Sequence, residues 1–247
     1  MNNGYFGDVK DLFKFDLIET LAKAMGIDQF TFVTMLTGPL EKETEGQLLK
    51  YEGQTGWHNK GLVKFLDDCV KGSNRDVVRI KDYFDSRGIN TCIYGDTEGC
   101  FDVKSRSKYF NDINADIIDK AIIFIDPDIG FQIKKSKEKH VLFSEVLNVF
   151  RVMSDDSLLI VFQHLNLPWD TPEYTIQRVL ENTPEDLRRS SLWLRNHQVI
   201  YFFFFKDSRI EAQLRTSLNA YQSEYPALVL SEQTITGQIS DQVKKGM

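Results

Sequence analysis

Two aspartates follow an apolar run in the middle of the chain, and their position predicts a ligand site. Residues 121–131 read AIIFIDPDIGF, so five apolar residues lead directly into Asp126-Pro127-Asp128. Such a run is typical of a strand that is buried on both faces. In an open α/β sheet, ligands bind beyond the carboxyl ends of the strands. The alternative is that Asp126 only caps the turn that ends the strand.

A lysine and an aspartate extend the apolar face of the first predicted helix. Apolar residues recur at helical spacing from Ile18 to Met25, and the same stripe continues toward the N-terminus through Lys14 and Asp11. A charge on a buried face costs free energy unless it is paired, so Lys14 is a candidate site residue. In the structural alternative Asp8 is the N-cap, Asp11 lies in the favourable first turn and Lys14 extends to water.

Polar residues also end two further predicted strands, with Thr34 and Thr37 after the first strand and Gln163-His164 after a later one. Strand ends that are distant in sequence meet at one edge of a sheet. We therefore predict one site at this edge. Its candidate catalytic residues are Asp126, Asp128, Lys14 and His164. Its candidate substrate-binding residues are Asp8, Asp11 and Gln163.

The elements that position these residues alternate between strands and helices. Predicted strands cover residues 30–36, 90–95, 121–126, 157–164 and 197–206. Predicted helices cover residues 11–25, 60–71, 76–86, 108–119, 140–153, 172–182, 184–195 and 208–222. This alternation predicts an α/β fold with a doubly wound, mostly parallel sheet. We expect a single domain over residues 1–247, with a loose C-terminal tail from about residue 238.

Composition and charge limit the classes of function. The formal net charge of -6 argues against a generally basic nucleic-acid-binding surface, although a local basic groove remains open. Three cysteines without CxxC spacing favour free thiols in a reducing compartment. The N-terminus lacks the pattern of a signal peptide, and the apolar run at residues 199–205 is too short to span a bilayer. We therefore expect a soluble, cytoplasmic protein that does not enter a membrane; its oligomeric state is not predicted.

Three segments together resemble the bacterial ribosomal-RNA adenine-N6 methyltransferase family: GDVKDLFKFDLIETL, FTFVTML and IFIDPDIGF. That family has an ADVLKH-type helix, a strand with an acidic glycine-rich loop, and a DPPY motif. The chain resembles more closely a family of uncharacterised function with the motifs GDxxDxxKYxLL, MLT, FDPDNGL and YQH. These motifs stand here as Gly7-Asp8, Asp11, Lys14-Phe15, Met35-Leu36-Thr37, Asp126-Pro127-Asp128-Ile129-Gly130-Phe131 and Phe162-Gln163-His164. This second resemblance spans most of residues 5–164.

The methyltransferase resemblance implies an S-adenosylmethionine-methyltransferase-like fold that acts on a nucleic acid or nucleotide. Asp126 is then in the position that accepts hydrogen bonds from an exocyclic amine, and Lys14 contacts substrate or cofactor. The candidate residues for binding S-adenosylmethionine are Thr34, Thr37 and Gly38.

The chain departs from the methyltransferase pattern at two places. Asp128 and Ile129 replace the second proline and the aromatic residue of DPPY, and that aromatic would stack on a flipped base. After the first strand, TMLTGPLEKETEG replaces acid-x-Gly-x-Gly, so Gly38 is the glycine that remains nearest the strand for close approach to a cofactor.

Two other classes of function use the same residues. In the first, a metal-dependent nuclease or phosphohydrolase, four acids hold Mg²⁺ or Mn²⁺, Lys14 stabilises a phosphate and His164 acts as general acid or base. The four acids are Asp8, Asp11, Asp126 and Asp128. In the second, a catalytically inert module with the same fold binds a nucleotide or partner. Basic residues interleaved with Trp193 and Tyr201 in the C-terminal third fit either a nucleic-acid surface or the solvated faces of two helices. They are Arg188, Arg189, Arg195, Lys206, Arg209 and Arg215.

Overall fold

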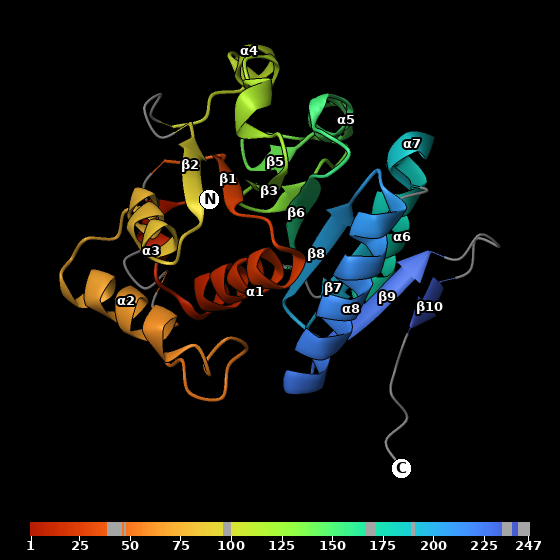
Figure 1. Cartoon of the computed structure of the whole chain (residues 1–247). Helices are drawn as coiled ribbons and strands as arrows, with labels where there is room; N and C mark the ends of the chain where they lie inside the picture. The colour runs from red at the N-terminus through yellow and green to blue at the C-terminus, as the bar shows by residue number, and fades with distance from the viewer. Residues whose placement is uncertain are drawn as a thin grey trace.

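Helices cover both faces of an eight-stranded mixed sheet (Figure 1). The structure is a computed structural model that describes residues 1–38, 46, 48–95, 100–165, 171–188, 191–233 and 239–241. The sheet has the strand order β10-β9-β7-β8-β6-β3-β1-β2. Its strands are β1 (Gln29–Thr34), β2 (Asn90–Tyr94), β3 (Ala121–Asp126), β6 (Leu158–His164), β7 (Ser191–Arg195), β8 (Val199–Phe204), β9 (Val229–Gln233) and β10 (Ile239–Asp241).

Helices connect these strands and pack on the sheet. They are α1 (Val9–Met25), α2 (Lys60–Lys71), α3 (Ile80–Ser86), α4 (Arg106–Asn111), α5 (Phe143–Val152), α6 (Pro172–Asn182), α7 (Glu185–Arg188) and α8 (Ser208–Glu224). A separate two-stranded sheet pairs β4 (Gly130–Phe131) with β5 (His140–Val141) in parallel. The predicted α/β class is therefore confirmed.

The sheet is parallel on one side and antiparallel on the other. β2, β1, β3 and β6 pair in parallel, whereas β8 pairs antiparallel with both β6 and β7. β9 also pairs antiparallel with β7 and β10. The sheet is thus mixed, and less parallel than the sequence predicts.

Side chains of alternate strand residues build one core on each face of the sheet. On one face, Phe32 of β1 and Phe124 of β3 pack in the cluster that includes α1, α2, α3 and α8. On the other face, Val33 of β1 and Ile125 of β3 pack in the cluster that includes α4, α5, α6 and α7. All residues of β3 are buried, as expected for a strand covered on both faces.

The predicted helix over residues 184–195 is wrong in its second half. Helix α7 ends at Arg188, and the segment SLWLR forms β7. Leu192 and Leu194 face one core while Trp193 faces the other, so the alternation has the period of a strand. Pairing with β8 and β9 on either side overrides the helix propensity of this short segment.

Other differences concern the ends of elements. The helix predicted over residues 108–119 is α4, which ends at Asn111, and the helix predicted over 140–153 begins only at Phe143, because His140 and Val141 form β5. Within the predicted loose tail, Ile239–Asp241 form β10; residues 238 and 242–247 lie outside the described residues. Cys69, Cys92 and Cys100 are free thiols, as predicted.

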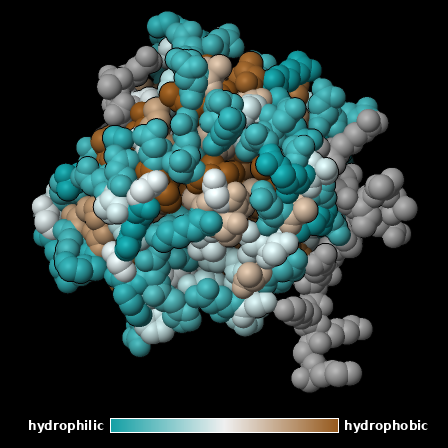
Figure 2. All heavy atoms as spheres, viewed as in Figure 1, coloured by the Kyte–Doolittle hydropathy of each residue, from teal (hydrophilic) through white to brown (hydrophobic). Residues whose placement is uncertain are grey.

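Hydrophilic residues cover most of the face shown in Figure 2, and hydrophobic residues are visible mainly in its upper central part. Among the helices of the described residues, none is long and apolar enough to cross a membrane.

Candidate functional site

The site lies at the carboxyl edge of β3, where the chain makes a sharp turn. Gly130 in this turn has φ +141°, a backbone conformation that L side chains rarely adopt. The Gln163 side chain fills the space beside it: Gln163 Oε1 accepts from the Phe131 N–H at 2.9 Å, and Gln163 Nε2 donates to the His164 carbonyl at 2.8 Å. Gln163 therefore fixes the turn that carries Asp128.

This role differs from the predicted one. Gln163 is buried, and it is not among the described residues that line the adjacent cavity. The sequence assigned it to substrate because it precedes His164 at the end of β6. Its side chain instead points to the opposite side of the strand from His164, as alternation along a strand requires.

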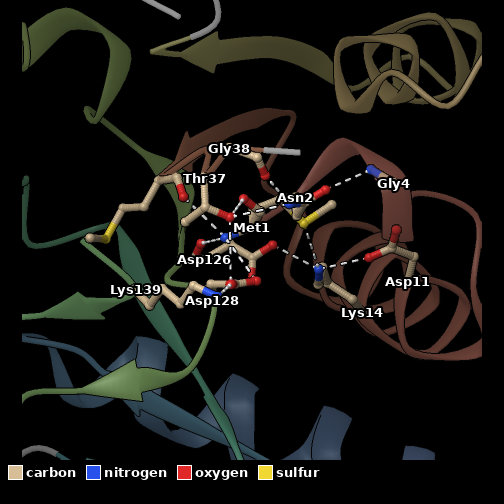
Figure 3. A network of polar contacts seen from close by, with 11 residues as sticks. Met1, Asn2, Gly4, Asp11, Lys14, Thr37, Gly38, Asp126, Asp128 and Lys139 are labelled. Carbon is tan, nitrogen blue, oxygen red and sulfur yellow. Dashed lines mark hydrogen bonds and ion pairs between the residues drawn. The ribbon is translucent and has the colours of Figure 1, made fainter. Parts of the chain in front are cut away.

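Helix α1 brings Lys14 to the end of β3. Asp8 is the N-cap of this helix and accepts from the N–H groups of Lys10 and Asp11. One helical turn later, Lys14 Nζ donates to Asp11 Oδ1 and to Asp126 Oδ2, both at 2.7 Å (Figure 3). The three side chains are almost completely buried, so this is a buried ion triad of one lysine and two aspartates.

The two aspartates keep Lys14 protonated and positively charged. Burial by itself lowers the pKa of a lysine, but the charges of Asp11 and Asp126 and the hydrogen bonds to them raise the pKa of Lys14 above its ordinary value. Burial raises the pKa of Asp11, and Lys14 opposes that change. Lys14 Nζ also lies 5.3 Å from the centre of the Phe162 ring, within the range of a cation–π contact.

A cavity of about 220 Å³ opens beside the triad. Charged side chains of both signs line it: Asp8, Asp11, Asp126, Asp128, Lys10, Lys14 and Lys139. The lining also includes Tyr5, Phe162 and His164. The structure thus brings together the four predicted catalytic residues and two of the three predicted substrate-binding residues.

Asp128 is less buried than Asp126 and faces several donors. Its Oδ2 lies 3.6 Å from Lys139 Nζ and 3.5 Å from Thr37 Oγ1, and its Oδ1 lies 3.9 Å from the Met1 amino nitrogen. The Met1 nitrogen also donates to the Asp126 carbonyl at 3.1 Å (Figure 3). The proline between the two aspartates therefore does not separate them into different sites; both carboxylates reach the same cavity.

The predicted cofactor-binding residues lie outside the cavity lining. Thr34 is buried and donates its hydroxyl to the Tyr94 carbonyl at 3.0 Å. Thr37 donates to the Met1 carbonyl at 3.2 Å, and the Gly38 carbonyl accepts from the Asn2 side chain. Residues 39–45 and 47 of the loop that follows lie outside the described residues.

His164 is a neutral imidazole at pH 7. Desolvation, and then the charge of Lys10, lower its pKa to about 3, while Asp128 opposes the shift. Lys10 Nζ contacts His164 Nε2, and because an ammonium only donates, the ring proton lies on Nδ1. Nδ1 is buried and has no hydrogen-bond partner within the described residues. His164 therefore offers the cavity an uncharged ring and is not a cationic general acid in the free protein.

The NMR signals of the His164 ring should stay constant from pH 8 to pH 5, because its pKa of about 3 lies far below that window. Since the unfolded chain has an ordinary histidine pKa near 6.5, the stability that His164 contributes is present above pH 6.5 and is lost as the pH falls toward 3. His164→Gln identifies the signal. A midpoint between pH 5 and pH 8 would show that the ring is not held neutral.

The four acids of the metal hypothesis all line the cavity, but Lys14 lies between two of them. Its ammonium bridges Asp11 and Asp126, at the position where a cation would bind both carboxylates. In the part of the chain that the structure describes, no group of three or more histidine, cysteine, aspartate or glutamate side chains has the geometry of a metal site.

Sequence reasoning did not assign several residues of the cavity lining to the site, among them Tyr5, Lys10, Lys139 and Phe162. Lys10 is one turn before Lys14 on α1, and Phe162 is two residues before His164 on β6, so helical and strand periodicity could have placed both on the site face. Lys139 comes close only because Ile129 N–H donates to its carbonyl at 2.9 Å, a contact that no local pattern indicates.

The basic C-terminal residues do not form the interleaved aromatic surface that one alternative required. Trp193 and Tyr201 are completely buried in the two cores, so neither ring can stack on a base. All four residues of the FFFF segment are buried, and the first three, Phe202 to Phe204, belong to β8, as predicted. Arg189 lies outside the described residues.

Comparisons with protein-family models, with curated proteins and with solved structures find no match to this chain.

Proposed function

We propose that this chain is a methyltransferase-like α/β protein that acts on a nucleic acid or nucleotide, and that its cavity receives a base with an exocyclic amine. Asp126 carries the proposal. It lines the cavity, and the hydrogen bonds to its side chain within the described residues come from Lys14 to Oδ2 alone. Its second oxygen is therefore the acceptor for an amine N–H.

The walls of the cavity support a flat, amine-bearing ligand. Tyr5, which is partly exposed, supplies an aromatic surface, and the buried Phe162 also lines the cavity; together they compensate for the aromatic residue that Ile129 replaces in the resemblance to DPPY. Stacking of a base on an aromatic side chain contributes about 1–3 kcal/mol. A volume of about 220 Å³ suits a nucleobase with part of its sugar, and is below the range of roughly 300–1,000 Å³ typical of pockets for larger ligands.

S-adenosylmethionine does not fit the residues predicted for it in this arrangement. Thr34 is bonded to a backbone carbonyl, and Thr37 and Gly38 contact Met1 and Asn2. We assign no step to the cofactor for this reason. The proposal rests on recognition of the substrate amine by Asp126, with Lys14 as the residue that orients the Asp126 side chain through the contact to Oδ2.

The test is binding of a single-stranded, adenine-containing oligonucleotide, compared with the same strand carrying inosine in place of adenine. The adenine strand should bind more tightly, and Asp126→Asn should weaken its binding at least about tenfold, because one hydrogen bond to a charged group contributes about 1.5–3 kcal/mol. Equal binding of the two strands would contradict the proposal. Strand cleavage that requires Mg²⁺ or Mn²⁺ would favour the hydrolase instead.

A further inference from the structure

A lysine-rich loop lies at the mouth of the cavity. Residues 132–139 (the lysine loop) connect β4 to β5 and contain four lysines and one glutamate, although the whole chain has a net charge of -6. Lys134, Lys135 and Lys137 are exposed, and Lys139 lines the cavity. Positive charge is thus concentrated next to the site in a protein that is otherwise acidic.

Two buried or partly buried arginines hold the backbone of the lysine loop in place. Arg178 Nη1 donates to the Gln132 carbonyl at 2.7 Å. Arg106 donates to the carbonyls of Lys137 and His140, and it is itself paired with Glu145. At the end of the loop, Ile129 N–H donates to the Lys139 carbonyl. The lysines are therefore presented on a backbone that is fixed to the same turn as Asp128.

The exposed lysines of the lysine loop differ from those of α2 in whether they form ion pairs with acidic side chains. Lys64 and Lys71 on α2 each pair with an aspartate four residues away on the same helix. In the part of the chain that the structure describes, Lys134, Lys135 and Lys137 form no ion pair, whereas Lys139 Nζ lies 3.6 Å from Asp128 Oδ2. Three neighbouring ammonium groups that have no carboxylate partner within those residues favour binding of an anion that carries several charges.

We propose that the lysine loop binds the phosphate backbone of a single-stranded nucleic acid whose target base occupies the cavity. This inference rests on the proposed function and narrows it, because it assigns a polynucleotide and not a free nucleotide as the substrate class. Lys137 is two residues from Lys139 and Lys134 is five, so the loop extends at most about 18 Å from the cavity mouth. That distance is long enough for the loop to reach phosphates on one side of the target base. Lys10 of α1 adds a further positive charge to the cavity lining.

The experiment measures binding of fluorescein-labelled single-stranded RNA and DNA 12-mers by anisotropy between 50 and 200 mM salt. The plot of log K against log salt has a slope of about −0.7 for each phosphate neutralised in a single strand. The triple variant Lys134→Ala, Lys135→Ala, Lys137→Ala should flatten the slope by about 2, and should weaken binding at 100 mM salt roughly 100-fold. The comparison of RNA with DNA affinity shows which of the two nucleic acids the protein prefers.

The matched control removes the same charge elsewhere, with Lys50→Ala, Lys64→Ala and Lys71→Ala, three exposed lysines outside the lysine loop. It should keep the wild-type slope, and both triple variants should keep the wild-type melting temperature and affinity for adenosine. An unchanged slope in the loop variant, or an equal loss in the control, would overturn the proposal.

The test separates this inference from the proposed function. If the protein binds adenosine in preference to inosine but binds a 12-mer no more tightly than adenosine monophosphate, the lysine loop is not a phosphate site and the proposed function stands. If 12-mer binding depends on the loop but adenosine and inosine bind equally, the loop proposal holds and recognition of an amine by Asp126 fails.

Discussion

Lys14→Met is expected to lower the free energy of unfolding by about 3–5 kcal/mol. The substitution leaves Asp11 and Asp126 buried without their shared cation, and loss of one partner from a buried ion pair has a cost of this size. Methionine keeps the length and most of the volume of the side chain, so packing changes little. Chemical denaturation at pH 7 measures the difference.

The control for Lys14 is Lys64→Met, which breaks an exposed ion pair with Asp68 on α2. Exposed pairs contribute about 0–1 kcal/mol, so this variant should be close to wild type. Adding Asp126→Asn to Lys14→Met should recover part of the loss, since one of the two uncompensated carboxylates is removed. If Lys14→Met is no less stable than Lys64→Met, the buried triad does not stabilise the fold.

Gly130→Ala is expected to destabilise the turn after β3 more strongly than the same change at a glycine with free space around it. A Cβ at Gly130 would lie 2.3 Å from Gln163 Oε1, and φ is +141°. Backbone strain of this kind costs of order 1–3 kcal/mol, and overpacking adds about 1–3 kcal/mol. The loss should also weaken ligand binding, because the turn positions Asp128.

Gly88→Ala is the matched control: φ is +78° there, and nothing lies within 4 Å of the added Cβ. Gly88 also has a positive φ but lacks the overlap with a neighbouring side chain, so Gly130→Ala should be the more destabilising of the two variants in thermal or chemical denaturation. Shortening that side chain by Gln163→Ala in the Gly130→Ala background should relieve the overlap. Equal destabilisation at Gly130 and Gly88 would show that Gln163 does not constrain the turn.

The edge of the sheet that carries the site could be predicted because the strongest signals are local. The apolar run of β3 and the helical stripe of α1 each indicate a buried element and its direction. The carboxyl-edge rule then brings Asp126 next to Lys14 across 112 positions of sequence. The cost of burying an unpaired charge made Lys14 a candidate site residue, but its pairing with both Asp11 and Asp126 is seen only in the structure.

Other parts of the site depend on contacts between residues that are far apart in the sequence, and no local pattern indicates these contacts. Thr34 ends β1 as predicted, but the register of β1 with β2 directs its hydroxyl to the Tyr94 carbonyl and away from the cavity. Gln163 and His164 are neighbours in sequence, yet strand alternation places one under the turn and the other in the cavity. Similarly, β7 is a strand because β8 and β9 pair with it on both sides.

The most direct measurement of the central claim is calorimetric titration of the purified protein with adenosine and, separately, with inosine. The two differ at the position of the exocyclic amine, where inosine carries an oxygen that cannot donate to Asp126. We expect adenosine to bind at least about tenfold more tightly, as one hydrogen bond to a charged group requires, and Asp126→Asn to remove most of the difference. Equal affinities, or no binding of either while Mg²⁺ or Mn²⁺ binds, would contradict recognition of an amine at this cavity.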